Sequence, residues 1–181
     1  MKTLSETTAL TQLKKLKTAY HEFIKIKYEH NAKSCLTCET QGVCCLDAHF
    51  VNVHITKLEA AAIRETLGKL SEEKQRRIFE RAKETVEKYD LKTSGNTFGQ
   101  TFACPLFEKG VGCLVHSDAK PAPCISHACY EKEADLPPEK FQEQTENRIE
   151  RLNKRTYGNA FSWLPIPVWL VNIYAKDFED K

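Results

Sequence analysis

The stretch CLTCETQGVCC, residues 35–45, decides how this chain can fold, because it places four cysteines within eleven positions. A second stretch, residues 104–129, holds the other four of the eight cysteines. All eight fall in segments predicted to be loops, whereas cysteines that serve only as small buried hydrophobic residues also occur inside helices. We therefore expect thiolates from both blocks to bind metal. The candidate metal ligands are Cys35, Cys38, Cys44, Cys45, Cys104, Cys113, Cys124 and Cys129.

Length and composition favour metal ligation over disulfide bonding. A chain of 181 residues, 41% hydrophobic and 29% charged, can bury a core without cross-links. The N-terminus lacks the apolar core of a signal peptide, and the longest apolar stretch, residues 161–175, is too short for a membrane span and contains two prolines. We expect a cytoplasmic protein without a membrane span, where disulfides are rare. The net charge of +2 gives no specific nucleic acid signal.

Cysteine spacing within the blocks constrains the kind of site. The two-residue gap between Cys35 and Cys38 brings two sulfurs onto one tetrahedral ion. Cys44 and Cys45 are adjacent, and adjacent side chains diverge on most backbones, so we expect them to serve different metals, or one to ligate while the other packs or does redox chemistry. Eight thiolates suffice for two four-cysteine sites of zinc or iron–sulfur type, and one cluster with accessory cysteines is the alternative.

Histidines are the secondary candidates. His116 and His127 lie within the second block, and imidazole suits both zinc and iron. Because the cysteines already supply enough ligands, we expect both histidines to lie beside the site or on the surface. His49 and His54, which flank a predicted strand, are weaker candidates.

The remaining sequence predicts a mainly α protein. Apolar residues recur at helical spacing from Leu4 to Tyr28, behind a capping-box spacing of Thr3 and Glu6. We expect the aromatic tail from Phe161 to pack across this helix. The other predicted elements are a short strand at 49–55, a helix capped by Thr56 that ends near Gly68, a helix capped by Ser71, and a polar helix from Pro137 to about Lys154.

These elements predict helices wrapped around a loop-rich, metal-stapled cysteine centre with a minor short β element. We interpret residues 1–181 as a single domain. Its parts are an N-terminal amphipathic helix (1–33), a cysteine-cluster region with a helical insertion (34–135), and a C-terminal helix with an aromatic tail (136–181).

Three stretches of the sequence resemble the CxxCxxCC family of zinc- or iron-chelating proteins, the YkgJ-like cysteine-cluster proteins. CLTCETQGVCC matches the opening cluster, VHITKLEAAAIRETL resembles the strand and helix that follow, and CPLFEKGVGCLVHSDAKPAPCISHAC is similar to the closing pattern. The resemblance covers residues 35–130, with five residues between Cys38 and Cys44 where the name-giving pattern has two. It implies a metal or iron–sulfur site and supplies no reaction.

The sequence predicts a metal-binding protein that chelates iron–sulfur or iron/zinc through the two cysteine blocks, with a redox role as one use of such a site. The cofactor is an iron–sulfur cluster or Zn2+, because thiolates suit both. The alternative is a structural-zinc module whose helical surface binds a protein partner. Whether the protein is an enzyme stays open, since no Ser/His/Asp set or phosphate loop is visible.

Overall fold

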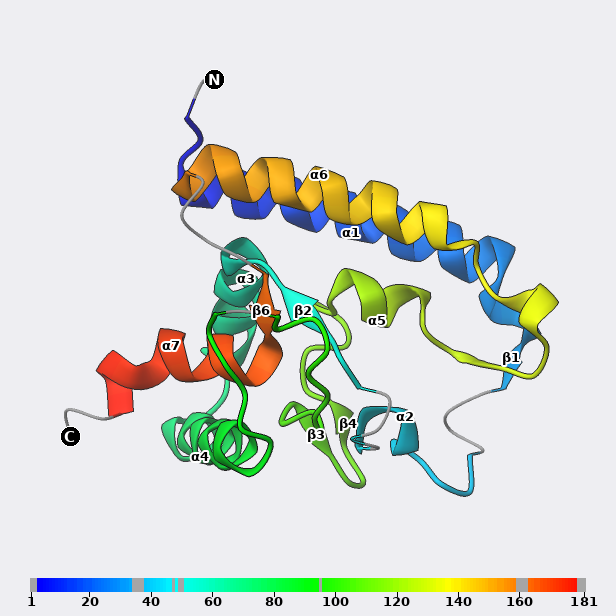
Figure 1. Ribbon diagram of the computed structural model, residues 1–181. Helices are drawn as coiled ribbons and strands as arrows, with labels where there is room; N and C mark the ends of the chain where they lie inside the picture. The colour runs from blue at the N-terminus through cyan, green and yellow to red at the C-terminus, as the bar shows by residue number, and fades with distance from the viewer. Residues whose placement is uncertain are drawn as a thin grey trace.

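Two long helices, α1 (Glu6–Lys27) and α6 (Glu139–Tyr157), lie side by side along one edge of the molecule (Figure 1). The structure is a computed structural model and describes residues 3–33, 38–46, 48, 51–94, 96–158 and 163–178. The two helices run antiparallel, and the amide of Leu4 donates a 3.0 Å hydrogen bond to the carbonyl of Arg155 where α1 begins and α6 ends. The mainly helical class predicted from the sequence is confirmed.

Helix α1 begins two residues later than predicted. Its N-cap is Ser5, whose hydroxyl accepts a 3.3 Å hydrogen bond from the amide of Thr8, so the predicted capping box of Thr3 and Glu6 is wrong. The Glu6 carboxylate instead accepts a hydrogen bond from the Tyr157 hydroxyl. The glutamate therefore links α1 to α6 rather than capping its own helix.

Helix α3 (Lys57–Leu67) lies between two buried apolar clusters. It begins with a complete capping box of Thr56 and Glu59, as predicted, and Gly68 is its C-cap. Leu58, near its start, packs into the cluster formed with α1 and α6, while Ile63 packs into the other. Both are fully buried, so α3 joins the two halves of the core.

The second cluster is built by α3, α4 (Glu72–Lys88) and α7 (Ile166–Phe178). Trp169 is buried there and donates a 2.9 Å hydrogen bond from Nε1 to the carbonyl of Ile55. The prediction that the aromatic tail packs across the N-terminal helix is wrong. Polar α6 occupies that position, because its buried Thr145, Ile149 and Asn153 form a stripe that fits against α1 and α3.

The strands are short and pair two by two. The predicted strand at 49–55 is reduced to β2 (His54–Ile55), which pairs antiparallel with β6 (Leu164–Pro165), and His49 lies outside the described residues. The carbonyl of Val51 bonds instead to the loop amide of Phe102. The other antiparallel pairs are β1 (Ala32–Lys33) with β5 (Cys129–Tyr130) and β3 (Phe107–Glu108) with β4 (Gly112–Cys113).

The remaining helices are short. Among the described residues they are α2 (Val43–Leu46), α5 (Ala122–Ser126) and the 3-10 turns η1 (Glu29–Asn31) and η3 (Glu133–Asp135). In Figure 1, α2 lies beside the β3–β4 hairpin, on the side of the molecule away from α1 and α6. The cysteines occur in and around these small elements.

Candidate metal centre

Five of the seven described cysteines lie in short helices or strands. Cys44 and Cys45 lie in α2, Cys124 in α5, Cys113 in β4 and Cys129 in β5, so the prediction that all cysteines lie in loops is wrong for these five, and Cys38 and Cys104 lie in loops. Each of these helices is about one turn long, and a single turn leaves its residues free to approach other segments. Cys35 lies outside the described residues.

A backbone hydrogen bond joins the two cysteine blocks. The amide of Cys104 donates to the carbonyl oxygen of Cys45 at 2.7 Å. Close to this hydrogen bond in sequence, Gly42 packs on the Phe107 ring of the β3–β4 hairpin. Its φ is +84°, and a Cβ added to it would lie 1.9 Å from Cζ of Phe107. Only glycine adopts this conformation readily and leaves room for the ring. Residue 42 therefore allows α2 to reach the second block.

Backbone amides lie close to the sulfurs of Cys104 and Cys113. Those of Leu106 and Phe107 act to lower the pKa of the Cys104 thiol, and that of Val115 acts to lower the pKa of the Cys113 thiol. The turn is closed by a 2.9 Å bond from the amide of Leu114 to the carbonyl of Leu106. Amide donors stabilise a sulfur that carries negative charge, which is the form that binds metal.

Burial opposes ionisation of the innermost thiols when no cation is present. It raises the pKa of the Cys104 thiol to about 12 despite the two amide donors, and it also raises the pKa of Cys124, with Cys104 and Cys113 nearby adding to the effect. The hydrogen bond to Cys44, followed by burial, raises the pKa of Cys45, and Cys104 and Cys124 are close enough to contribute. Thiols of both blocks therefore lie within electrostatic reach of one another.

Cys44 has the opposite environment. Hydrogen bonds with the Cys45 thiol and then with the His127 ring lower the pKa of Cys44 to about 4. The two adjacent thiols thus have opposite pKa directions, lowered for Cys44 and raised for Cys45. The expectation that the two side chains serve separate purposes stays a prediction, and the structure brings them into mutual contact.

Three basic side chains surround the thiols. Lys120 interacts electrostatically with Cys113 and Cys124. Arg81, from α4, interacts with Cys104, donates to the Phe107 carbonyl at 3.4 Å, and has a buried Nε that bonds to no described residue. The third is Lys17, described next. Positive charge favours the thiolate form of nearby cysteines.

Lys17 and Glu59 form a buried ion pair, with 3.5 Å between Nζ and Oε1 and side-chain exposures of 8% and 0%. Lys17 also donates to the carbonyl of Ala119 at 3.3 Å, while Glu59 Oε1 accepts from the amide of Ala122 at 3.4 Å. Burial lowers the pKa of the Lys17 ammonium, and Glu59 and Cys124 counteract this. The pair therefore fixes the segment that leads into α5, and with it the position of Cys124.

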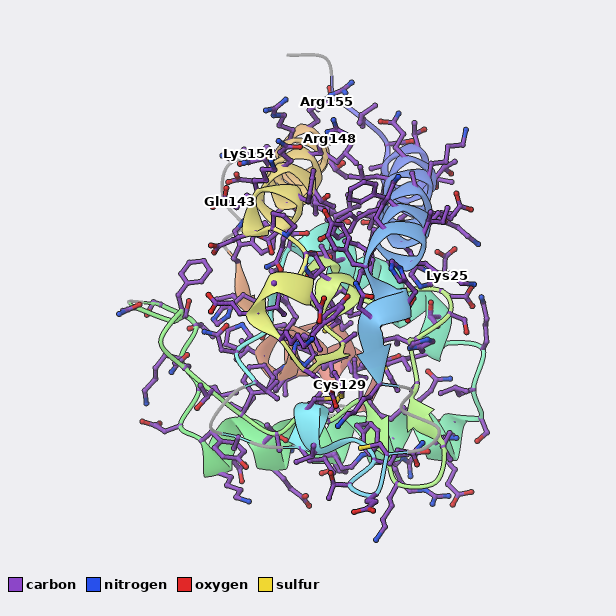
Figure 2. All side chains as sticks on the ribbon, turned by 90° about the vertical axis from the view of Figure 1, so that its right-hand side faces the viewer. Lys25, Cys129, Glu143, Arg148, Lys154 and Arg155 are labelled. Carbon is purple, nitrogen blue, oxygen red and sulfur yellow. The ribbon has the colours of Figure 1, made fainter. Side chains whose placement is uncertain are left out.

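The remaining described cysteines, Cys129 and Cys38, both lie within electrostatic reach of Lys33. Lys33 is opposite Cys129 in the antiparallel register, and its ammonium interacts with Glu131 and then with Cys129 and Cys38. Cys129 is labelled in Figure 2, where it lies above α2 in that view. Lys33 therefore lies near one cysteine of each block.

His54 and His116 differ in their surroundings. The ring of His54 is buried, and its nitrogens lie 3.0 Å and 2.8 Å from the carbonyls of Asn52 and Thr97. His116 is largely exposed. The partial burial of its ring, followed by the charges of Lys120 and His21, lowers its pKa. No contact of either ring with a thiol is recorded among the described residues, and the roles expected for these histidines stay predictions.

The thiols gather without forming a closed ligand set. Across the described ranges, no three His, Cys, Asp or Glu side chains are grouped so that they could hold one metal ion, and no disulfide joins the seven described cysteines. The donor chemistry suits a thiophilic metal: thiols, backbone amides aimed at sulfur, and nearby cations. The sequence does not predict the pairing of Lys17 with Glu59, although Lys17 lies on the apolar face of α1, where a charged residue needs a partner.

Comparison with known proteins yields no relative. No family model matches the chain, and neither a curated protein nor a solved structure matches it. In the part of the chain that the structure describes, no helix has the length and apolar character to cross a bilayer.

Proposed function

We propose that this protein binds a thiophilic metal, as zinc, iron or an iron–sulfur cluster, through thiolates drawn from both cysteine blocks. The observation that carries the proposal is the 2.7 Å hydrogen bond from the Cys104 amide to the Cys45 carbonyl, which fixes the two blocks against each other. Residues some sixty positions apart in sequence are thereby held with their thiols in electrostatic reach.

The thiol environment supports metal binding over plain packing. Backbone amides close to the Cys104 and Cys113 sulfurs favour the thiolate form of both residues. The pKa of Cys104 at about 12 means that the thiolate is unstable there without a cation. A bound metal ion removes this penalty, because it deprotonates a coordinating thiol outright. The site is thus suited to thiolates only when a metal is present.

The surrounding cations support an anionic centre. Four thiolates on a divalent ion carry net negative charge, and a buried negative charge requires compensation. Lys17, Arg81 and Lys120 supply it from three different segments. A reducing compartment such as the cytoplasm would keep these thiols available. The resemblance to the YkgJ-like proteins implies the same function.

The test is anaerobic purification of the full chain followed by metal analysis, acid-labile sulfide analysis and absorption spectroscopy. Iron with sulfide and a brown colour identifies an iron–sulfur cluster, and colourless protein with stoichiometric zinc identifies a zinc site. Protein that contains neither metal, and takes up neither after reduction and reconstitution, would refute the proposed function.

A further inference from the structure

Helix α6 carries a row of polar and basic side chains along one face. The row follows spacings of four, three and four residues, which keeps its members on one side of a helix. Its members are Gln144, Arg148, Arg151 and Arg155. In Figure 2, Arg148 and Arg155 lie on the side of α6 that faces α1, whereas Glu143 and Lys154 lie on the far side.

Helix α1 carries a matching row at the same spacing. Its members, all exposed, are Thr8, Gln12, Lys15 and Ala19. Contacts at both ends show that the two rows follow the line where the helices meet. The rings of Phe23, one turn after Ala19, and Phe141, one turn before Gln144, have centroids 4.9 Å apart. At the other end, the Leu4 amide donates to the Arg155 carbonyl. We call the two rows together the seam surface.

The cations of the seam surface lack acidic partners. Within the described ranges, no ion pair of Lys15, Arg148 or Arg151 occurs. Four residues before Arg148 and Arg151, where a glutamate would pair with them, stand the amides Gln144 and Asn147.

Helix α4 shows the opposite arrangement. Arg76 and Arg77 each pair with a glutamate four residues earlier, at 3.8 Å and 2.7 Å, and Arg81 pairs with Glu108 at 3.2 Å. The arginines of α4 are therefore neutralised within the protein, while those of the seam surface are available to an anion from outside.

The residue types on the seam surface indicate the chemistry of that anion. The two rows contain arginine, lysine, glutamine and threonine, with no acidic or aromatic residue and with alanine as their only apolar residue. Protein interfaces have an apolar core with aromatic side chains, and helices that lie on membranes bury an apolar face. The seam surface has neither feature. Its side chains are instead the types that contact phosphate oxygens of nucleic acids.

We propose that the seam surface binds the phosphate backbone of a nucleic acid without reading its sequence. From Arg148 to Arg155 the row rises about 10 Å along α6, and a strand carries a phosphate about every 3.4 Å of its axis, so about three phosphates lie within reach. The net charge of +2 does not reveal this surface, because it averages over the whole chain. The inference is independent of metal binding.

The test is fluorescence anisotropy of the full-length protein with labelled single-stranded DNA and RNA of mixed sequence, from about 50 to 200 mM salt. With four cations engaged, the logarithm of affinity should fall against the logarithm of salt with a slope of about −3. The double variant Arg148→Gln with Arg151→Gln should reduce this slope to about −1.5 and weaken binding roughly 10- to 100-fold at about 50 mM salt.

The matched control is Arg76→Gln with Arg77→Gln, which removes the same charge from exposed positions on α4, away from α1 and α6 (Figure 1). It should keep the slope and change affinity by no more than about threefold, because distant charges are screened. Circular dichroism confirms that each variant is folded.

The inference is overturned if the wild type shows no salt-dependent binding, or if both double variants lose affinity equally. It is also overturned if polyglutamate of equal charge, or phosphatidylserine vesicles, compete as well as unlabelled nucleic acid, because the surface would then serve an acidic protein or a membrane. No seam residue is a cysteine, so each of these outcomes leaves the proposed metal binding unaffected.

Discussion

The amide of Cys104 donates a 2.7 Å hydrogen bond to the carbonyl of Cys45, and this contact joins the two cysteine blocks of the chain. Each residue belongs to a small element, α2 or the loop before β3, that has little core of its own. Their mutual position is therefore fixed by a few specific contacts, and each contact makes a testable prediction.

Thiol reactivity should differ sharply between Cys44 and Cys104 in the metal-free protein. The Cys44 pKa of about 4 makes it a thiolate at neutral pH, so its alkylation rate should be nearly independent of pH from about 6 to 9. The Cys104 pKa of about 12 keeps it a thiol, so its rate should rise about tenfold per pH unit over that range. Mass spectrometry after iodoacetamide treatment measures both. Equal rates with the same pH dependence would contradict these environments.

The buried ion pair should be a large contribution to stability. Lys17→Met leaves the Glu59 carboxylate buried without its counter-charge, and removal of one partner of a buried pair costs about 3–5 kcal/mol in the free energy of unfolding. Urea denaturation measures the change. Exposed Lys14, on the same helix, provides the matched control, and Lys14→Met should change stability by no more than about 1 kcal/mol.

A double variant separates charge from packing at this pair. Lys17→Met combined with Glu59→Gln has no uncompensated charge, so it should be more stable than Lys17→Met alone. If the double variant is less stable than the single one, the loss in Lys17→Met does not come from the unpaired carboxylate.

Gly42→Ala should disturb the approach of α2 to the hairpin. The residue has φ +84°, and the added methyl group would overlap the Phe107 ring. Gly110 is a matched control, since it has φ +80° with no atom within 4 Å of an added Cβ. Gly110→Ala should cost only the backbone strain of about 1–2 kcal/mol.

We expect Gly42→Ala to cost more than Gly110→Ala and also to reduce zinc binding, because α2 carries Cys44 and Cys45. Denaturation and metal content of the two variants measure this. The same loss of stability in both, with unchanged zinc content, would show that the contact with Phe107 does not position α2.

The sequence predicts the elements with strong local signals. The capping box of Thr56 and Glu59 and the N-cap Ser71 stand where the spacing places them, because these contacts are made within four residues. The start of α1 was mispredicted because a tertiary contact with Tyr157 uses the Glu6 carboxylate. Local pattern alone contains no information about that partner.

The sequence does not predict which helices pack together, and it does not predict the single-turn helices. The sequence predicts that the aromatic tail packs on α1, yet Trp169 bonds to Ile55 and packs with α3 and α4. Amphipathic periodicity shows that a face is buried, but not which helix covers it. The single-turn helices around Cys44 and Cys124 have no propensity signal at all, since their conformation depends on long-range contacts such as Glu59 with Ala122.

The candidate site was predictable as a set of residue types and not as an arrangement. The cysteine spacing indicates metal chemistry. The structure adds that the two blocks meet, because Cys45 lies within electrostatic reach of Cys104 and Cys124. Which basic residues surround them could not be deduced, because Lys17 and Arg81 come from distant helices.

Metal stoichiometry of cysteine variants tests the shared centre most directly. The full chain and the variants Cys45→Ser, Cys104→Ser and the double variant are purified anaerobically, and bound metal is measured per chain, with circular dichroism to confirm folding. We expect each single variant to lose the same metal equivalent and the double variant to lose no more than either. Loss of separate equivalents that add in the double variant would contradict a centre built from both blocks.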